Sequence, residues 1–135
     1  MSNETRFERT YYADGQIETE TPYIGDRLEG VSRQWYGNGQ LRSETTMENW
    51  VHHGPIRIWS DSGDLVYEED FVHGTGLFRS FYDDGGLESE IAMANNLPHG
   101  VLRCWDEEGV LIAEQYFLSG KRVSRKRFEQ SQSQP

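Results

Sequence analysis

A chain of 135 residues is long enough for one compact domain or one short repeat array, and too short for two domains with independent cores. Only 35% of the residues are hydrophobic, but 13% are aromatic and 14 are glycine, a composition typical of strands and turns rather than of disorder. The net charge of −10 argues against nucleic-acid binding over the main surface, because acidic surfaces repel phosphates.

The cysteine content and the hydropathy of the chain indicate its cellular compartment. A single cysteine, Cys104, excludes an internal disulfide and favours a reducing compartment. No window approaches the ~18 consecutive apolar residues of a membrane span, and the first ten residues are polar. We therefore expect a cytoplasmic protein.

One phrase recurs along the chain. The segment WYGNGQLRSE at 35–44 returns in related form at 11–20, 59–68, 81–90 and 105–114. Each copy contains a glycine, and successive glycines are 24, 24, 22 and 24 residues apart. A fixed period of this length is typical of repeat architectures. The five glycines are Gly15, Gly39, Gly63, Gly85 and Gly109.

Each of the five units has the same internal order. An aromatic residue stands four positions before the glycine, and apolar residues follow two and eight positions after it. Even spacing along a strand would place these apolar residues on one face. A second glycine precedes the aromatic residue of the last four units. The order predicts strand, tight turn, strand and glycine loop. The aromatic residues are Tyr11, Trp35, Trp59, Phe81 and Trp105, and the nearer apolar residues are Ile17, Leu41, Leu65, Leu87 and Leu111.

These units predict an all-β fold. Glycine returns twice per unit and no 3.6-residue apolar stripe persists, so helices are disfavoured. We expect an elongated antiparallel meander of about five consecutive hairpins in a single sheet over residues 1–128. The aromatic and aliphatic stripe would be its core. Residues 129–135, EQSQSQP, are expected to be a disordered tail.

The hairpin register has two solutions in the sequence. Only the third turn position is always glycine, which favours a three-residue loop with a glycine bulge. However, every unit has Arg two residues before its aromatic residue and Glu five after its glycine, and a two-residue turn would pair Arg33 with Glu44 directly. Both registers stay open. We expect these charges to form a ladder across the sheet, from Arg9 through Glu20 and Arg33 to Arg127.

The repeated phrase resembles a known repeat. The pattern aromatic-x-x-(Asp/Asn)-Gly-x-Leu-x-x-Glu, followed by an apolar position and (His)-Gly, is similar to the MORN repeat variant over residues 11–128. Tandem copies of that variant occur in bacterial antitoxins of the YwqK type. The resemblance implies an elongated sheet of hairpins, a non-enzymatic module and a protein or lipid partner.

Catalytic, cofactor and metal sites are not expected. Equivalent histidines such as His53 and His99 would lie about 10 Å or more apart, too far to share a metal. Cys104 lies in the strand sequence LRCW with no base beside it. The repeated glutamates have identical settings, whereas acid–base catalysis needs carboxylates with different environments. We interpret all of them as structural.

Two features suggest partner binding. The hairpin tips from the third unit onward are acidic, and a row of carboxylates favours a basic protein partner. Trp50 belongs to no repeated position and could anchor a partner, although packing over a sheet edge is the commoner role of such a residue. Ordinary solvated turns are the alternative for the tips. The tip residues are Asp61, Asp64, Asp83, Asp84, Glu107 and Glu108.

The charge distribution supports the same partner class. Residues 1–120 hold 22 acidic and 8 basic residues, whereas 121–129 hold five basic residues and one Glu. The basic segment KRVSRKRF is expected to be a terminal strand that discourages edge association. The sequence thus predicts a non-catalytic module that binds a basic protein, and the resemblance suggests a toxin domain. The alternatives are membrane or lipid association through the basic segment, and a scaffold for assembly.

Overall fold

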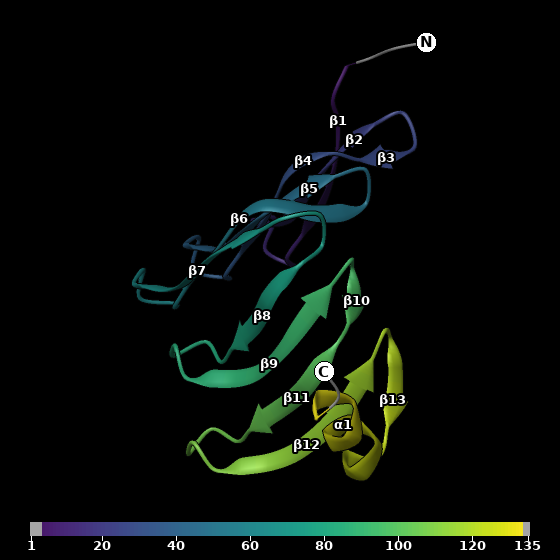
Figure 1. Ribbon diagram of the computed structural model, residues 1–135. Helices are drawn as coiled ribbons and strands as arrows, with labels where there is room; N and C mark the ends of the chain where they lie inside the picture. Colours follow the sequence, from purple (N-terminus) through teal and green to yellow (C-terminus); the bar gives the residue numbers. More distant parts are fainter. Residues whose placement is uncertain (1–3, 134–135) are drawn as a thin grey trace.

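The computed structural model describes residues 4–133 and contains two antiparallel sheets and one helix (Figure 1). The predicted all-β meander of hairpins is confirmed, but the prediction of one continuous sheet is wrong. The first sheet contains β1 (Arg6–Tyr11), β2 (Ile17–Ile24), β3 (Arg27–Leu28), β4 (Gly30–Trp35), β5 (Leu41–Glu48), β6 (Val51–Trp59) and β7 (Leu65–Phe71). The second contains β8 (Gly76–Phe81), β9 (Leu87–Ala94), β10 (Leu97–Pro98), β11 (Gly100–Trp105), β12 (Leu111–Leu118) and β13 (Lys121–Val123), and α1 (Arg125–Gln132) follows.

The sheet breaks between β7 and β8, in the unit that is two residues shorter than the others. There the chain turns through His73 and Gly74, closed by a bridge between Val72 and Thr75, and β8 begins at once at Gly76. The longer units insert a short return segment at this point, and the next strand then pairs with the preceding hairpin, as β9 does with β11. Without those two residues β8 pairs with β9 alone.

The hydrophobic core lies at this break, which we call the elbow. Ile56 and Phe71 are 1% exposed, and Tyr67 is also buried. The Phe71 ring packs against Phe78 of the second sheet with ring centroids 6.3 Å apart. The elbow therefore joins the two sheets through apolar contacts and single hydrogen bonds instead of pairing between strands.

The predicted core stripe is wrong. Tyr11, Leu65 and Leu111 are about half exposed, whereas Met47 and Phe71 are buried. The reason is a one-residue bulge after each hairpin tip. In the second unit Trp35 pairs with Leu41 but Gln34 pairs with Ser43, so the extra residue moves the later half of the strand to the other face.

The same bulge resolves the two registers. The tip is a three-residue loop: Tyr36 N–H donates to the Gln40 carbonyl oxygen (2.9 Å), and Gly39 has φ +86°. Beyond the bulge the pairing shifts by one residue, so that Arg33 lies directly opposite Glu44. Each register that the sequence left open is therefore correct for one part of the hairpin.

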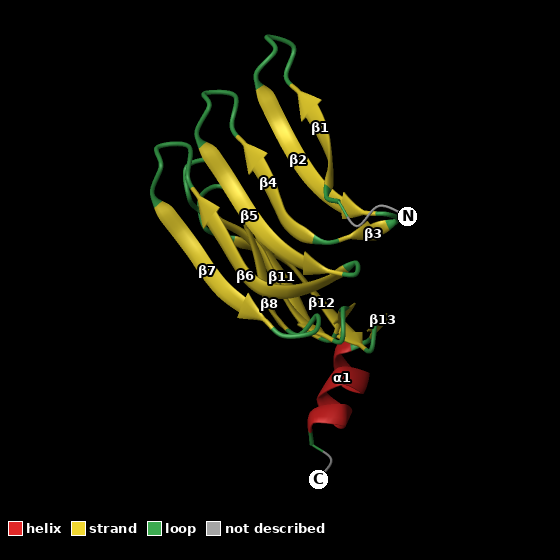
Figure 2. Ribbon diagram, turned by 90° about the horizontal axis from the view of Figure 1, so that it is seen from above, coloured by secondary structure: helices red, strands yellow, loops and turns green. Residues whose placement is uncertain are grey.

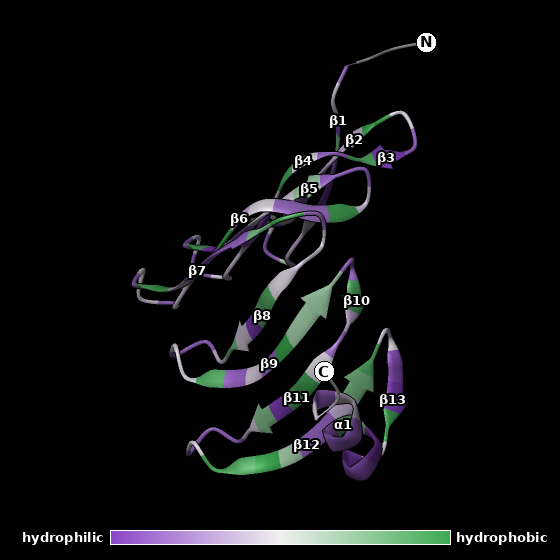
Figure 3. Ribbon diagram, in the orientation of Figure 1, coloured by the Kyte–Doolittle hydropathy of each residue, from purple (hydrophilic) through white to green (hydrophobic). Residues whose placement is uncertain are grey.

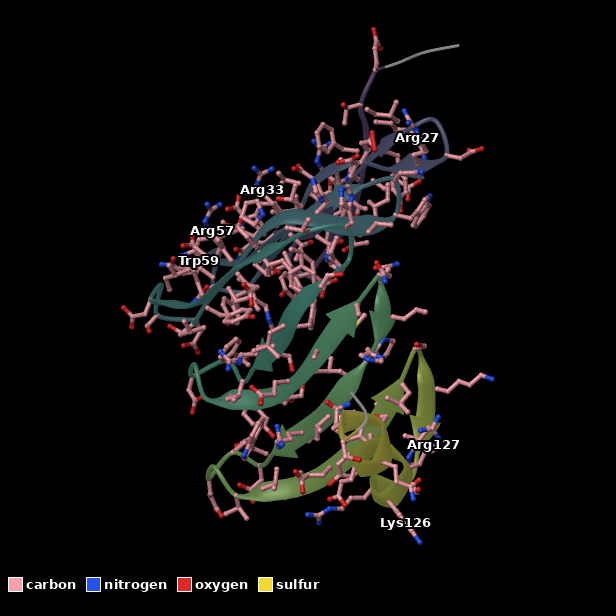
Figure 4. All side chains as sticks on the ribbon, in the orientation of Figure 1. Arg27, Arg33, Arg57, Trp59, Lys126 and Arg127 are labelled. Carbon is pink, nitrogen blue, oxygen red and sulfur yellow. The ribbon has the colours of Figure 1, made fainter. Side chains whose placement is uncertain are left out.

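The charged ladder is confirmed within hairpins. All five Arg–Glu pairs are present, with Arg Nε to Glu Oε2 distances of 2.6–3.0 Å. Figure 4 shows Arg33, Arg57 and Trp59 on one face of the first sheet. Between hairpins the ladder continues from Glu20 to Arg33 and from Glu90 to Arg103, each at 3.7 Å.

The end predicted for the ladder is wrong, because Arg127 lies in α1 and not in a strand (Figure 4). Gly30 and Gly100, which begin β4 and β11, and Gly54, which lies within β6, have φ between +116° and +141°. Ser124 holds the equivalent position with φ −71°, and its Oγ accepts from Arg127 N–H (3.0 Å), which caps α1. Residues 129–132 of the expected disordered tail lie in this helix, and 134–135 lie outside the described residues.

Candidate functional site

The hairpin tips lie along one edge of the molecule and the turns with the second glycine along the opposite edge (Figure 2). A cleft of about 380 Å³ opens at the tip edge, across the elbow. We call it the acidic cleft, because five carboxylates and one guanidinium line it. Its lining residues are Arg42, Asp61, Phe81, Tyr82, Asp83, Asp84, Glu88 and Glu107.

Only some of the acidic tip residues predicted from the sequence line the acidic cleft. Asp61, Asp83, Asp84 and Glu107 line the cleft, whereas Asp64 and Glu108 lie outside it. The four cleft carboxylates come from three successive tips. They converge because the elbow tilts the fourth tip toward the third.

Backbone contacts hold this arrangement. Asp61 N–H donates to the Asp83 carbonyl oxygen (2.9 Å), which ties the third tip to the fourth across the elbow. The Asn38 side-chain amide donates to the Asp61 carbonyl oxygen (2.9 Å) and ties the second tip to the third. The carboxylates are therefore carried by loops that are fixed to each other.

Sequence reasoning missed Arg42 and Glu88. Both occupy the bulge position after a tip, a place that the repeated phrase hides because its residue type varies from unit to unit. Arg42 Nη1 lies 3.3 Å from Asp83 Oδ1, and its guanidinium lies 5.0 Å from the Tyr36 ring centre. The cleft thus already holds one arginine side chain of this protein.

Charged side chains of the acidic cleft change the pKa of Tyr36. Burial raises the pKa of the Tyr36 phenol, the Arg42 guanidinium opposes that rise, and the carboxylates of Asp83 and Asp61 add to it. The Tyr36 hydroxyl donates to the Trp59 carbonyl oxygen (2.7 Å) of the next unit. Arg42 therefore opposes the effect of the carboxylates at this phenol.

Trp50 lies on the opposite edge, so it does not form one site with the acidic residues. It is 52% exposed and holds φ +70°, a rare conformation for a bulky side chain. Its indole Nε1–H donates to the Asp26 carbonyl oxygen (3.0 Å), and its ring centre lies 5.9 Å from that of Tyr23. The indole joins two neighbouring turns, and half of it faces outward.

The histidines at the repeated position before the second glycine have a structural role. His53 Nδ1 accepts from His73 N–H and His99 Nδ1 accepts from Ser119 N–H, both at 2.9 Å. Each imidazole thereby ties its own unit to the turn of the next. Among residues 4–133, no three His, Cys, Asp or Glu side chains are grouped to hold a metal ion.

The basic C-terminal segment is exposed. β13 pairs with the end of β12, and α1 packs on β12 through Phe128 and Tyr116, whose ring centres are 5.5 Å apart. Arg125 is paired with Glu129 (2.9 Å). In the part of the chain that the structure describes, no helix has the length and apolarity required to cross a membrane.

Comparison with known proteins finds a similarity to one family of repeats. Residues 8–24, 28–49 and 75–95 match the family model described as MORN repeat variant. The matches fall on the first, second and fourth units. No catalytic family matched. Neither the curated proteins nor the solved structures gave a match.

Proposed function

We propose that this chain of MORN-variant repeats is a non-catalytic module that binds a basic segment of another protein in the acidic cleft. The observation that supports the proposal is the convergence of carboxylates from three tips around one concave surface. Complementary charge of this kind accelerates encounter and selects partners by sign. The acidic body as a whole, with 22 acidic and 8 basic residues in 1–120, would attract the same partner.

The chemistry of the cleft favours arginine. A guanidinium pairs with carboxylates through several donors and stacks on aromatic rings. Arg42 shows both contacts inside this cleft, with Asp83 and with the Tyr36 ring. We propose that an arginine of the partner takes a comparable position among Asp84, Glu88 and Glu107.

A more specific proposal is that this protein neutralises a toxin by binding to it. The sequence resembles antitoxins built from the same repeat, and a rigid acidic cleft suits an inhibitor that covers a basic surface of a toxin domain. A basic toxin domain encoded beside this chain is the first partner to test. Its activity should fall on addition of the purified chain and return when the cleft is reversed in charge.

Charge reversal in the cleft tests the binding proposal. We expect Asp83→Lys with Glu107→Lys to weaken binding of a fluorescent peptide of alternating arginine and serine at least ~10-fold, measured by anisotropy at low salt. A peptide with glutamate in place of arginine should not bind. The control is Asp26→Lys with Asp70→Lys, which makes the same charge change at exposed positions away from the cleft.

The control pair decides the interpretation. Equal losses in the cleft variant and the control variant would show that only net charge attracts the peptide, and would overturn the proposed site. A flotation assay with anionic vesicles tests the lipid alternative. Flotation that is lost when Lys121, Arg122 and Lys126 are replaced by Gln would favour that alternative instead.

A further inference from the structure

The two ends of the strand array have open edges. Within residues 4–133 β1 pairs only with β2, and all six residues of β1 are exposed. β12 pairs with β11 on its inner side, and on its outer side β13 covers only residues 116–118. Among the described residues, no strand pairs with 111–115 of β12 on that outer side. Such edges offer free backbone donors and acceptors to another strand.

The open edge of β12 exists because the array stops at Ser124. In the fourth unit, Gly100 begins the strand that pairs with β9 at Ser89 and Glu90. In the fifth unit Ser124 caps α1 instead, and α1 contacts β12 through Phe128 and Tyr116 while its C-terminal end extends beyond the strands (Figure 2). No strand within residues 4–133 thus occupies the position that the first strand of a sixth unit would take.

The exposed start of β12 is apolar. Ile112 is 62% exposed and Leu111 is 45% exposed, and Figure 3 shows a hydrophobic stretch in this part of β12. Arginine or lysine, which commonly protects an edge strand, is absent from β12. The basic residues that the sequence suggested for that purpose lie in β13 and α1.

The charges along the ladder indicate which kind of strand could pair with the open edge of β12. Glu20 is paired on both sides, by Arg9 of its own hairpin (2.9 Å) and by Arg33 of the next (3.7 Å). Glu90 is flanked in the same way, and both side chains are only 16–17% exposed. Glu114 is paired with Arg103 of its own hairpin (3.0 Å) and is 33% exposed.

The remaining cation near Glu114 is already engaged. The Arg125 guanidinium donates to Glu129 Oε1 (2.9 Å) within α1, and this hydrogen bond raises the pKa of Arg125 more than the Glu114 carboxylate does. A strand that completes the array should therefore supply an arginine opposite Glu114, with an aromatic residue two positions later, as Arg33 and Trp35 do.

β1 has this pattern at the other end of the molecule. Arg9 is followed two positions later by Tyr11, and it pairs with Glu20 of its own hairpin. The equivalent Arg33 and Arg103 each contact a second glutamate from the preceding unit. The two ends of the array thus carry complementary charges, Glu114 at one end and Arg9 at the other.

We infer that this protein self-associates head to tail, with β12 of one copy pairing antiparallel with β1 of the next so that Arg9 lies opposite Glu114. The register follows from the contacts between units, where Arg103 faces Glu90 and Cys104 faces Ser89. The equivalent pairs between copies are Arg9 with Glu114 and Thr10 with Ala113. The open edge is therefore a site for a second copy of this chain.

Charge disfavours the two symmetric alternatives. Pairing β12 with a second β12 would bring two Glu114 carboxylates together, and pairing β1 with a second β1 would bring the two Arg9 side chains together. A head-to-tail contact does not close on itself unless its rotation forms a ring, so chains of copies are expected. The contact is small, and we expect a dissociation constant of roughly 100 µM.

Complementary charge variants test the contact. The full chain should show concentration-dependent association by sedimentation velocity. Glu114→Arg alone and Arg9→Glu alone should each weaken association at least ~10-fold, because each places like charges at the contact. An equimolar mixture of the two variants should restore it, since Arg at 114 of one then meets Glu at 9 of the other. Thermal unfolding of each variant verifies that it is folded.

The control is Glu108→Arg, which makes the same charge change at an exposed tip outside the contact and should leave association unchanged. A wild-type chain that stays monomeric to millimolar concentration would overturn the inference. So would single variants that associate normally, or a mixture that fails to recover. None of these outcomes bears on the acidic cleft, because neither Arg9 nor Glu114 lines it.

Discussion

Successive repeats are connected differently at an ordinary joint and at the elbow. At the joint between the fourth and fifth units, β9 pairs with β11, and the Tyr82 hydroxyl donates to the Trp105 carbonyl oxygen (2.7 Å). At the elbow Ser60 stands in place of that tyrosine and β7 pairs with β6 alone. The joint thus uses pairing between strands, whereas the elbow uses apolar burial with single hydrogen bonds, from Asp61 N–H to the Asp83 carbonyl oxygen and from the Tyr67 hydroxyl to the Leu77 carbonyl oxygen.

This difference explains why the buried core of this protein is small and lies at the elbow. A flat array of hairpins has no second layer, so its apolar stripe stays half exposed. Two missing residues fold the second sheet against the first and create one buried cluster around Ile56 and Phe71. The same fold brings the third and fourth tips together into the acidic cleft. An irregularity in the repeat therefore supplies both the core and the candidate site.

Restoring the missing residues should have the largest effect. We expect insertion of Leu-Pro between Gly74 and Thr75, combined with Ser60→Tyr, to convert the elbow into an ordinary joint, because it recreates the segment that the fourth unit has at Leu97–Pro98. Small-angle X-ray scattering should show a longer molecule with a larger radius of gyration. Ser60→Tyr alone is the control, and an unchanged shape after the insertion would show that the elbow has another cause.

Removing the Phe71 ring should destabilise the protein more than truncation at an ordinary joint. Phe71→Ala leaves a cavity at a fully buried position, and we expect the free energy of unfolding to fall by about 3–5 kcal/mol. Met93 holds the same repeat position in the fourth unit and is only half-buried, so Met93→Ala should cost about 1–2 kcal/mol. Urea denaturation measures both, and equal losses would contradict a core concentrated at the elbow.

Acid should weaken the elbow through His52. Its ring centre lies 5.4 Å from that of Phe71, and its Nδ1 is buried without a hydrogen-bond partner among the described residues. Burial lowers the pKa of His52 below its ordinary 6.5. The unfolded chain therefore binds this proton first, and the free energy of unfolding falls as the pH drops below about 6.5, levelling off below the folded-state pKa.

Replacing the imidazole checks that assignment. In His52→Leu the free energy of unfolding should depend less on pH between pH 7.5 and 5 than in the wild type, as measured by urea denaturation at several pH values. His99→Leu provides a comparison at an ordinary joint. A pH dependence that His52→Leu leaves unchanged would assign the effect to other groups.

The smallest effect is expected for the ladder. A double-mutant cycle on Arg57 and Glu68, whose side chains are 41% and 55% exposed, should give a coupling of about 0.2–1 kcal/mol. The pair lies beside the elbow, where the ladder is interrupted. Arg33 with Glu44 lies in the continuous part and is more buried, so its coupling should be larger. A cycle with no coupling in either pair would leave the ladder without an energetic role.

Much of the fold could be predicted because it depends on residues close in sequence. A hairpin pairs Arg33 with Glu44 across only eleven residues, and a turn glycine with φ > 0 marks each tip. The sequence also showed both irregularities, the short third unit and Ser124. It did not show their consequences, since the direction of β8 depends on how Phe71 packs once the connection is shortened.

The sequence predicted that the candidate site would be acidic, but it did not predict which residues line it. Acidic residues at the tips were visible in the repeated phrase, but their neighbours depend on the tilt at the elbow. Asp64 was predicted and lies outside the cleft, while Glu88 and Arg42 were missed and line it. The sequence singled out Trp50 as an exception to the repeat, and its position on the opposite edge follows from the alternation of turns.

The sequence by itself determined the hairpins, their period, their glycine-bulged tips and the charged pairs within them, because these are contacts over short stretches of chain. Only the tertiary structure decided that there are two sheets, which face is buried and which carboxylates meet. Those outcomes depend on a single-residue bulge that exchanges the faces of a strand and on a shortened turn that changes its direction. Both are small local changes whose effect on packing appears only when distant strands come together.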